Sequence, residues 1–363
     1  MKILYIAPDI TDSGGIARVI SLKTNYFVSS FNYKVVILSV NDCTSNRFYD
    51  FNSDIKWLNI KKSKYFFPFF RNYIRLINET ISRENPDVIV ICDAVLWLFI
   101  PWFVKPKIPI IFETHFSVSF EKVKNRNLYT KLRSKLVHFF KQNTINKFSC
   151  FVSVTDEGSK EWNAKKRIVI PNPVSFKITE KANLVNKRAM AVCVITHIKG
   201  LDRLLLIWSR ITEKHLDWQL DIYGQWDADS EYQEMADKLN ISNNINFLSP
   251  VKDIQQSYNQ SSVFLMTSRT EAFGMVLIEA MASGVPCIAY DCPSGPRTII
   301  DDEVNGFLIE DGNTDSFVQK LELLIEDENL RFQMGKAAQE SVKKYEIEGI
   351  MKKWDKLFLE VVN

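Results

Sequence analysis

The sequence lacks an apolar stretch long enough to cross a lipid bilayer. The most membrane-like run, Ala94 to Val104, has eleven residues and is interrupted by Pro101, whereas a spanning helix needs about 20 apolar residues. We also expect no signal peptide, because the apolar run that begins after Lys2 ends at Ala7 and acidic residues follow. We therefore expect a cytoplasmic protein in which residues 94–104 are buried or interfacial.

The cysteines show neither a metal-binding spacing nor the pattern of a disulfide-bonded secreted domain. Three of the six, Cys92, Cys150 and Cys193, lie in or beside apolar, strand-like runs, which favours reduced thiols in a core. Internal repeats and low-complexity tracts are absent as well. The chain has 363 residues, of which 46% are hydrophobic and 25% charged. These values are typical of a soluble protein with two domains.

A net charge of only +3 conceals a division along the chain. Residues 1–176 contain 26 Lys and Arg against 14 Asp and Glu, whereas residues 177–363 contain 20 against 29. Such asymmetry indicates two domains with different partners. The boundary is expected at Pro171-Asn172-Pro173, because two prolines around an asparagine continue neither a helix nor a central strand.

The first residues read as the start of a doubly wound α/β domain. A buried strand over 2–7 is followed by Gly14-Gly15 and by a helix-like stretch, 17–27. The ligand of such a domain is expected at the turn after the strand, where glycine lets the backbone approach a bound group. A complete dinucleotide-binding fingerprint is missing, so the turn alone is a weak signal.

His115 follows a predicted buried strand, 109–112, and so lies where open α/β sheets bind ligands. A purely structural histidine is the alternative. In the second half, a buried strand is predicted over 189–195 and an amphipathic helix over 201–211. Lys199, in the turn between them, is well placed to neutralise a pyrophosphate.

The strongest pattern is a pair of acids, Glu271 and Glu279, separated by eight residues. A helical apolar run, 275–281, begins between them directly after Gly274, and the first amides of such a helix form a seat for phosphate. Eight residues is a little over two helical turns, so both carboxylates are expected on one side of that seat. The alternative is an ordinary buried helix with two solvated glutamates.

Two basic segments rich in aromatic residues lie in the first half, at 61–75 and 122–147. Lysine and arginine mixed with aromatic side chains suit an anionic membrane face. A solvated charged face over a core helix is equally compatible. RNA would also suit such segments, but no nucleic-acid-binding module accompanies them, so no nucleic acid is expected.

The segment from Glu271 to Pro286 closely resembles the signature of family 4 glycosyltransferases, which are retaining enzymes of the GT-B fold. Asp291 to Ile300, Asn305-Gly306 and Lys199-Gly200 resemble the same family. The resemblance implies two doubly wound Rossmann-like domains that face each other across a cleft. They would be an acceptor-binding domain, 1–172, and a nucleotide-sugar-binding domain, 173–345, with a C-terminal helix, 346–363, that packs back on the first domain.

The resemblance also supplies the chemistry. It implies transfer of a hexose or N-acetylhexosamine from a nucleotide sugar, here expected to carry UDP, to a sugar hydroxyl with retention of configuration. The expected acceptor is a growing, lipid-linked glycan in polysaccharide, O-antigen or capsule synthesis, at the inner face of the plasma membrane. The donor is a co-substrate, and neither a cofactor nor a metal is expected.

Site roles are carried over onto matching positions. Glu271 would position the sugar, with His115 beside the transferred sugar, and Glu279 would hold the ribose. The remaining donor-binding residues implied are Gly14, Gly15, Ile16, Lys199, Val251, Phe273, Gly274, Met275 and Val276.

One position departs from the family pattern. Cys193 and Val194 stand where a Gly-Arg pair is expected, so half of the cationic clamp on the pyrophosphate is missing. Arg203 or Arg297 could substitute, or the donor affinity could be lower. Two alternative functions stay open: a GT-B nucleotide-sugar epimerase, and a non-catalytic partner of another glycosyltransferase.

Overall fold

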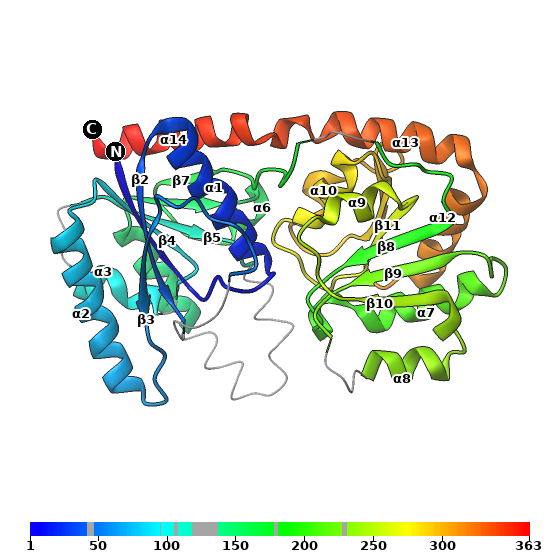
Figure 1. Ribbon diagram of the computed structural model, residues 1–363, viewed down its shortest axis with the longest axis horizontal. Coiled ribbons are helices and arrows are strands. Elements are labelled where there is room, and N and C mark those ends of the chain that lie inside the picture. The colour runs from blue at the N-terminus through cyan, green and yellow to red at the C-terminus, as the bar shows by residue number, and fades with distance from the viewer. Residues whose placement is uncertain (42–46, 95, 105–107, 118–136, 178–180, 227–230) are drawn as a thin grey trace. The chain divides into compact units, whose positions relative to one another are not determined.

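The computed structural model describes residues 1–363 except 42–46, 95, 105–107, 118–136, 178–180 and 227–230. The chain divides into two compact units, which we call unit 1 (Met1–Pro173 with Ile347–Asn363) and unit 2 (Val174–Glu346). Each unit contains one parallel sheet flanked by helices (Figure 1), which confirms the predicted pair of doubly wound α/β domains. Among the described residues, no helix has the length and apolar character that a membrane span requires.

Unit 1 is built on a seven-stranded sheet with the order β3-β2-β1-β4-β5-β6-β7. Its strands are β1 (Lys2–Ala7), β2 (Lys34–Val40), β3 (Lys56–Ile60), β4 (Val88–Cys92), β5 (Ile110–Thr114), β6 (Cys150–Ser153) and β7 (Arg167–Val169). Its α-helices within the described residues are α1 (Gly15–Phe31), α2 (Phe66–Glu84), α3 (Ile100–Phe103), α6 (Asp156–Lys160) and α14 (Ile347–Val362).

The apolar runs of β1, β2, β4, β5 and β6 are buried, as expected for parallel strands covered by helices on both faces. Along β1, Ile3 and Tyr5 belong to the core beneath α1 and α14. The alternate residues Leu4 and Ile6 belong to the core beneath α2. The sheet therefore separates two layers of helices within this unit.

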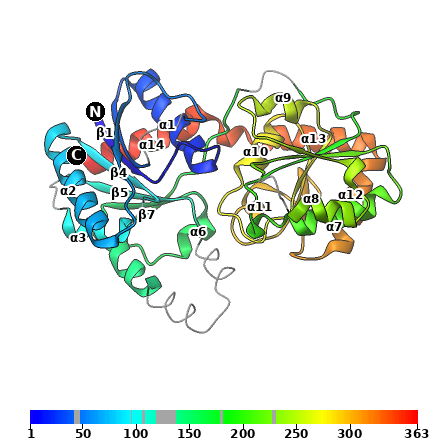
Figure 2. The ribbon, with the colours of Figure 1, turned by 60° about the horizontal axis from the view of Figure 1, so that its bottom comes forward.

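The last helix, α14, returns the chain to unit 1, as the predicted fold class requires. Its buried residues, which include Trp354 and Phe358, recur at helical spacing. The Phe358 ring lies 5.2 Å from that of Phe27 on α1, and Asp355 accepts a hydrogen bond from the Tyr33 hydroxyl. Figure 2 shows α14 running beside α1 over one face of the sheet.

Unit 2 is built on a six-stranded sheet with the order β10-β9-β8-β11-β12-β13. Its strands are β8 (Arg188–Val192), β9 (Gln219–Tyr223), β10 (Ile245–Leu248), β11 (Val263–Met266), β12 (Cys287–Tyr290) and β13 (Gly306–Ile309). Its α-helices are α7 (Leu201–Thr212), α8 (Glu231–Lys238), α9 (Ile254–Asn259), α10 (Met275–Ala282), α11 (Pro296–Ile299), α12 (Thr314–Glu326) and α13 (Glu328–Ser341).

Each sheet has a point at which the strand order reverses. In unit 1 the chain builds outward from β1 to β3 and then returns to place β4 beside β1. In unit 2 it builds outward from β8 to β10 and returns to place β11 beside β8. Open α/β sheets bind ligands beyond the carboxyl ends of the strands at such points.

Candidate active site

In unit 2, the ends of β8 and β11 bring Lys199 and Glu271 together. Lys199 lies in the turn after β8, and Glu271 follows β11. The Lys199 Nζ donates a hydrogen bond to Glu271 Oε2 over 2.5 Å. Burial lowers the pKa of the Lys199 ammonium, but the Glu271 carboxylate more than offsets this, and the pKa is raised above its ordinary value. A cation and an anion therefore lie side by side at the point where the strand order of unit 2 reverses.

Both side chains of this pair keep some exposure, 27% for Lys199 and 15% for Glu271. The pair is therefore accessible to a ligand, and the partial burial strengthens its electrostatic interactions relative to water. An anion that bound Lys199 would compete with Glu271 for the ammonium. Such competition would release the carboxylate to accept hydrogen bonds from another part of the same ligand.

The helix α10 begins beside this pair, directly after Gly274. Gly274 has φ +97°, in the left-handed region that favours glycine, and its carbonyl accepts hydrogen bonds from the amides of Leu277 and Ile278. Within the described residues, the amides of Met275 and Val276 donate to no backbone carbonyl, as is usual for the first residues of a helix. These two amides can therefore bind an anion.

The side chain of Phe273, another predicted donor-binding residue, is part of the packed interior of unit 2. Its ring is 2% exposed and packs edge-on against Tyr345, with the ring centres 5.4 Å apart. Its backbone is thus the only part of this residue in a position to contact a donor.

Glu279 lies on α10 and is 6% exposed, which excludes the alternative of a solvated glutamate. Its Oε1 accepts a hydrogen bond from the Ser175 hydroxyl at 2.6 Å, and its Oε2 accepts one from the Tyr258 hydroxyl at 3.1 Å. Buried carboxylates require such partners. The carboxylate is thereby held in a defined orientation.

The helical-spacing argument that linked the two acids is wrong. Glu271 does not lie on α10, which begins at Met275, but pairs as an isolated parallel bridge with Ser294. The Gly295 amide donates to the Glu271 carbonyl at 2.8 Å. Glu271 is therefore positioned by the loop after β12, and only Glu279 is positioned by α10.

The predicted strand over 189–195 is too long. The strand β8 ends at Val192, and Val194 is 53% exposed. Neither Cys193 nor Val194 offers a cation, so the structure retains the departure from the family pattern at this position.

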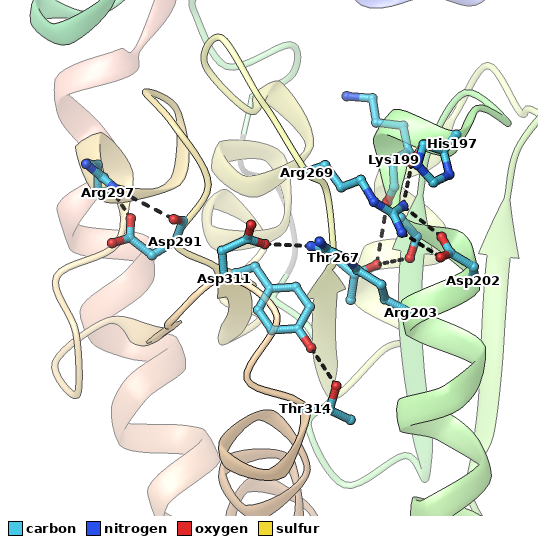
Figure 3. Close-up of polar contacts among 12 residues, drawn as sticks. His197, Lys199, Asp202, Arg203, Thr267, Arg269, Asp291, Arg297, Asp311 and Thr314 are labelled. Carbon is cyan, nitrogen blue, oxygen red and sulfur yellow. Dashed lines mark hydrogen bonds and ion pairs between the residues drawn. The ribbon is translucent and has the colours of Figure 1, made fainter. Parts of the chain in front are cut away.

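The nearby arginines are engaged by carboxylates (Figure 3). Arg203 donates to Asp311 Oδ1 at 2.5 Å, and Arg297 donates to Asp291 Oδ1 at 2.7 Å. Arg269, which sequence reasoning did not consider, forms a two-point ion pair with Asp202 at 2.8 and 2.6 Å. Each of these pairs would have to open before its arginine could bind phosphate.

Val251, one of the donor-binding residues that the resemblance implies, lies in the loop after β10 and is 40% exposed. Beside this loop, the Trp226 indole donates to the Leu248 carbonyl at 2.9 Å and lies edge-on to Phe247. The sequence does not predict this contact, because no spacing rule connects Trp226 to β10. The order of the strands in the sheet determines that the loop containing Trp226 packs beside the loop after β10.

In unit 1, Gly14 and Gly15 form the start of α1 after β1. The Gly14 amide donates to Asp12 Oδ1 at 2.9 Å, and a Cβ at Gly14 would lie 2.9 Å from the same oxygen. A Cβ at Gly15 would meet nothing within 4 Å. Ile16 is half-buried against the core beneath α1. The glycine turn follows β1, beside which the strand order of unit 1 reverses.

His115 comes directly after β5 and belongs to a buried polar network that sequence reasoning missed. Its Nε2 lies 3.0 Å from Glu113 Oε1, and its backbone amide donates to Asp93 Oδ2 at 2.5 Å. Glu113 in turn accepts hydrogen bonds from the Lys23 ammonium on both oxygens, at 2.5 and 2.6 Å. The chain thus brings together residues from α1, the end of β4 and β5.

The carboxyl groups of this network have opposite pKa shifts. Burial raises the pKa of Glu113, but the positive charge of Lys23 outweighs it, and the pKa falls to about 2. Burial raises the pKa of Asp93 to about 6, against the opposing effect of His115. An acid directly after the apolar strand β4 was the sequence signal for Asp93, whereas nothing in the sequence pairs Lys23 with Glu113.

Cys92, Glu113 and His115 are the one group of three or more potential metal donors within the described residues, with donor atoms within 4.8 Å of one another. Both Glu113 oxygens already accept hydrogen bonds from Lys23. A metal would have to displace that buried ammonium. The arrangement of these residues is accordingly that of an ion-pair network.

Comparison with known proteins shows similarity to glycosyltransferases. Residues 177–341 match the protein-family model described as "Glycosyl transferases group 1". The amylovoran biosynthesis glycosyltransferase AmsD of Erwinia amylovora is 28% identical over 98% of this chain and 98% of its own length. The lipopolysaccharide 1,6-galactosyltransferase of Salmonella typhimurium is 25% identical over 90% of both chains.

A solved structure of Anabaena HepE in complex with UDP and glucose has a TM-score of 0.76 at 17% identity, over 99% of both chains. This likeness shows the fold. Taken with the sequence matches, it identifies the chain as a glycosyltransferase of the GT-B fold.

Proposed function

We propose that the protein is a retaining glycosyltransferase that moves a hexose or N-acetylhexosamine from a UDP-sugar to a sugar hydroxyl of a growing, lipid-linked glycan. The Lys199–Glu271 pair beside the first amides of α10 is the observation that carries this proposal. The relatives in amylovoran and lipopolysaccharide synthesis support a surface polysaccharide as the product. The UDP bound to the Anabaena neighbour supports the choice of nucleotide.

In the proposed reaction, Lys199 and the amides of Met275 and Val276 bind the diphosphate and stabilise the charge that develops as it leaves. This arrangement needs no metal ion. Diphosphate binding draws Lys199 away from Glu271, and the freed carboxylate then accepts hydrogen bonds from the donor sugar. The leaving phosphate oxygen removes the proton of the acceptor hydroxyl on the face from which it departs, which retains the anomeric configuration.

Glu279 serves the ribose rather than the anomeric carbon. Ser175 and Tyr258 already orient its carboxylate, and a carboxylate has about four lone-pair positions for donors. Ribose hydroxyls would join or replace these partners. A glycosidase mechanism with two cooperating carboxylates is not implied, because Glu279 is directed toward its own structural partners.

The decisive experiment incubates the purified protein with a panel of nucleotide sugars, with and without lipid-linked glycan acceptors, and follows nucleotide release. We expect acceptor-dependent release from a UDP-hexose or UDP-N-acetylhexosamine. Interconversion of the free donor without an acceptor would instead indicate an epimerase. Failure of every donor to bind would leave the non-catalytic alternative, which the missing arginine at Val194 motivates.

We further propose that unit 1 contacts an anionic membrane through exposed aromatic residues at the start of α2 and on α3. Phe67 and Trp102 are 79% and 53% exposed. The ring of Phe70 links α2 to Phe103 of α3, with centres 5.2 Å apart. Lys147 lies over the Trp102 ring at 3.9 Å. Most of the second predicted basic segment, through residue 136, lies outside the described residues.

The membrane proposal predicts salt-sensitive flotation with phosphatidylglycerol vesicles and little with phosphatidylcholine vesicles. Phe67→Ser with Trp102→Ser should weaken binding, whereas Leu216→Ser, which removes an exposed apolar side chain of unit 2, should not. Absence of binding to anionic vesicles at low salt would reject the proposal. The inner face of the plasma membrane would then lose its support as the site of action.

A further inference from the structure

A buried ion pair in unit 1 contacts the side chain of His115. The side chains of Lys23 on α1 and Glu113 on β5 are 1% and 2% exposed. The Lys23 ammonium donates to both carboxylate oxygens, at 2.5 and 2.6 Å. Removing two charges from water costs several kcal/mol for each ion, and apolar side chains of similar volume often replace such a pair without loss of stability. A role other than stability is therefore the more economical explanation of this pair.

Two aromatic rings also lie close to the Lys23 ammonium. Its Nζ lies 3.7 Å from the centre of the Trp354 ring on α14 and 5.6 Å from that of Tyr5 on β1. Cation–π attraction favours the charged ammonium there. Lys23 is thus a desolvated cation whose hydrogen bonds go to Glu113, and it offsets the charge of that carboxylate.

The ionised Glu113 carboxylate determines which nitrogen of the neighbouring imidazole carries a proton. Glu113 Oε1 also lies 3.0 Å from His115 Nε2, and an ionised carboxylate only accepts hydrogen bonds. The proton of this contact must therefore reside on Nε2. Because Lys23 already balances Glu113, the imidazole need not be charged to satisfy the carboxylate.

Asp93 and Thr114 fix the backbone that carries the ring. The His115 amide and the Thr114 hydroxyl donate to the two oxygens of Asp93, at 2.5 and 2.8 Å. The other titratable groups around this network are Tyr5 and Cys92, and burial raises the pKa of both. These two groups are therefore neutral at neutral pH. Within the described residues, no hydrogen bond to Nδ1 of His115 is found.

We propose that Lys23 and Glu113 are positioning residues that hold His115 as its neutral Nε2–H tautomer, so that Nδ1 accepts a hydrogen bond from a hydroxyl of a bound sugar. The acceptor role of Nδ1 rests on the proposed function. The tautomer itself does not, since it follows from contacts within unit 1. A sugar hydroxyl that meets an acceptor nitrogen is oriented by it, whereas an imidazolium would offer only donors.

The tautomer is measured directly by long-range ¹H–¹⁵N correlation spectra of the full chain labelled with [¹⁵N]histidine. The chain has only four histidines, and a His115→Gln variant assigns the signal. The spectra are recorded above the pKa of about 6 that burial gives Asp93. We expect one His115 species with a protonated Nε2 and an unprotonated Nδ1. A protonated Nδ1, whether in the other tautomer or in the cation, would overturn the proposal.

The test variant is Lys23→Met with Glu113→Gln, which removes both charges together and leaves no unpaired buried ion. A glutamine amide can either donate to or accept from Nε2, so the variant should populate both tautomers. Its kcat with the donor sugar should fall about tenfold, as expected for loss of one oriented hydrogen bond, with a smaller change in KM.

Glu84→Gln provides the matched control. Glu84 is another buried carboxylate of unit 1 held by lysines, Lys2 and Lys56, but it lies toward the amino end of the sheet, near the start of β1. We expect it to lose stability without changing the His115 signal or kcat. An unchanged His115 tautomer in the double variant, or an altered tautomer with unchanged kcat, would overturn the positioning role. If the wild-type tautomer is as proposed but no donor reacts, only the proposed function fails.

Discussion

At the scale of single residues, the two glutamates of unit 2 have different surroundings and therefore different expected roles. Glu271 is partly exposed and bonded to a lysine that a diphosphate would attract. Glu279 is buried and oriented by two hydroxyls. The sequence spacing placed both carboxylates on one side of a phosphate seat, and their different roles were implied only by the resemblance.

We predict that Glu271→Ala lowers kcat by about a hundredfold, in the range seen when one group that stabilises a transition state is lost, while circular dichroism stays unchanged. Glu279→Ala should mainly raise the KM for the donor. Its loss would also remove the acceptor of the hydrogen bonds that the Ser175 and Tyr258 hydroxyls donate, so a lower melting temperature is expected for this variant alone. Full activity in both variants would show that the assignment of these residues is wrong.

At the scale of structural elements, the turn between β8 and α7 is shaped by a close backbone approach. Gly200 has φ +67°, and a Cβ at this position would lie 2.0 Å from the Thr267 carbonyl oxygen at the end of β11. The Thr267 hydroxyl donates to the Gly200 carbonyl at 2.9 Å. Glycine at this position therefore joins the two strand ends that carry Lys199 and Glu271.

Gly200→Ala should accordingly lower both the melting temperature and the donor affinity. Gly312→Ala is the control, because Gly312 has a similar φ, +85°, but a Cβ there would meet nothing within 4 Å. The left-handed backbone alone costs about 1–2 kcal/mol for a residue with a Cβ, and both variants bear that cost. Equal effects of the two substitutions on unfolding in urea would contradict the argument from close approach.

The sequence predicts the ends of helices and strands less well than their presence. The helix predicted over 17–27 extends from Gly15 to Phe31 and ends at Asn32, which adopts a left-handed conformation. The strand predicted over 189–195 is shorter at its end, because Val194 leaves the sheet and is exposed. Apolar periodicity locates such elements, but caps and neighbouring strands set their ends.

At the scale of the whole molecule, two buried carboxylates make unit 1 sensitive to acid. Burial raises the pKa of Glu113, but the positive charge of Lys23 outweighs the effect of burial. Hydrogen bonds from Lys56 and Lys2 lower the pKa of Glu84. Both pKa values fall from the ordinary 4.5 to about 2. A depressed pKa stabilises the folded state above the unfolded value and loses that contribution as pH falls toward the folded value.

We therefore predict a loss of stability between about pH 4.5 and about pH 2, the window that these two pKa values define. Urea unfolding followed across this window measures it. The Lys23→Met, Glu113→Gln variant should lose less stability over the same range, because one of the two carboxylates no longer titrates. A loss identical to that of the natural sequence would show that Glu113 does not contribute to acid sensitivity.

The sequence by itself determined the class of fold and located strands such as β1, β5 and β8 and the turns that follow them, because apolar alternation and glycine are local properties of the chain. It also placed Lys199, Glu271 and His115 after strands, where ligands of parallel sheets bind. Only the tertiary structure decided which of these groups meet. The Lys199–Glu271 pair, the Ser294 contact of Glu271 and the Lys23–Glu113–His115 network each join residues distant in the chain. The order of strands in a sheet creates such contacts, and no local pattern encodes them.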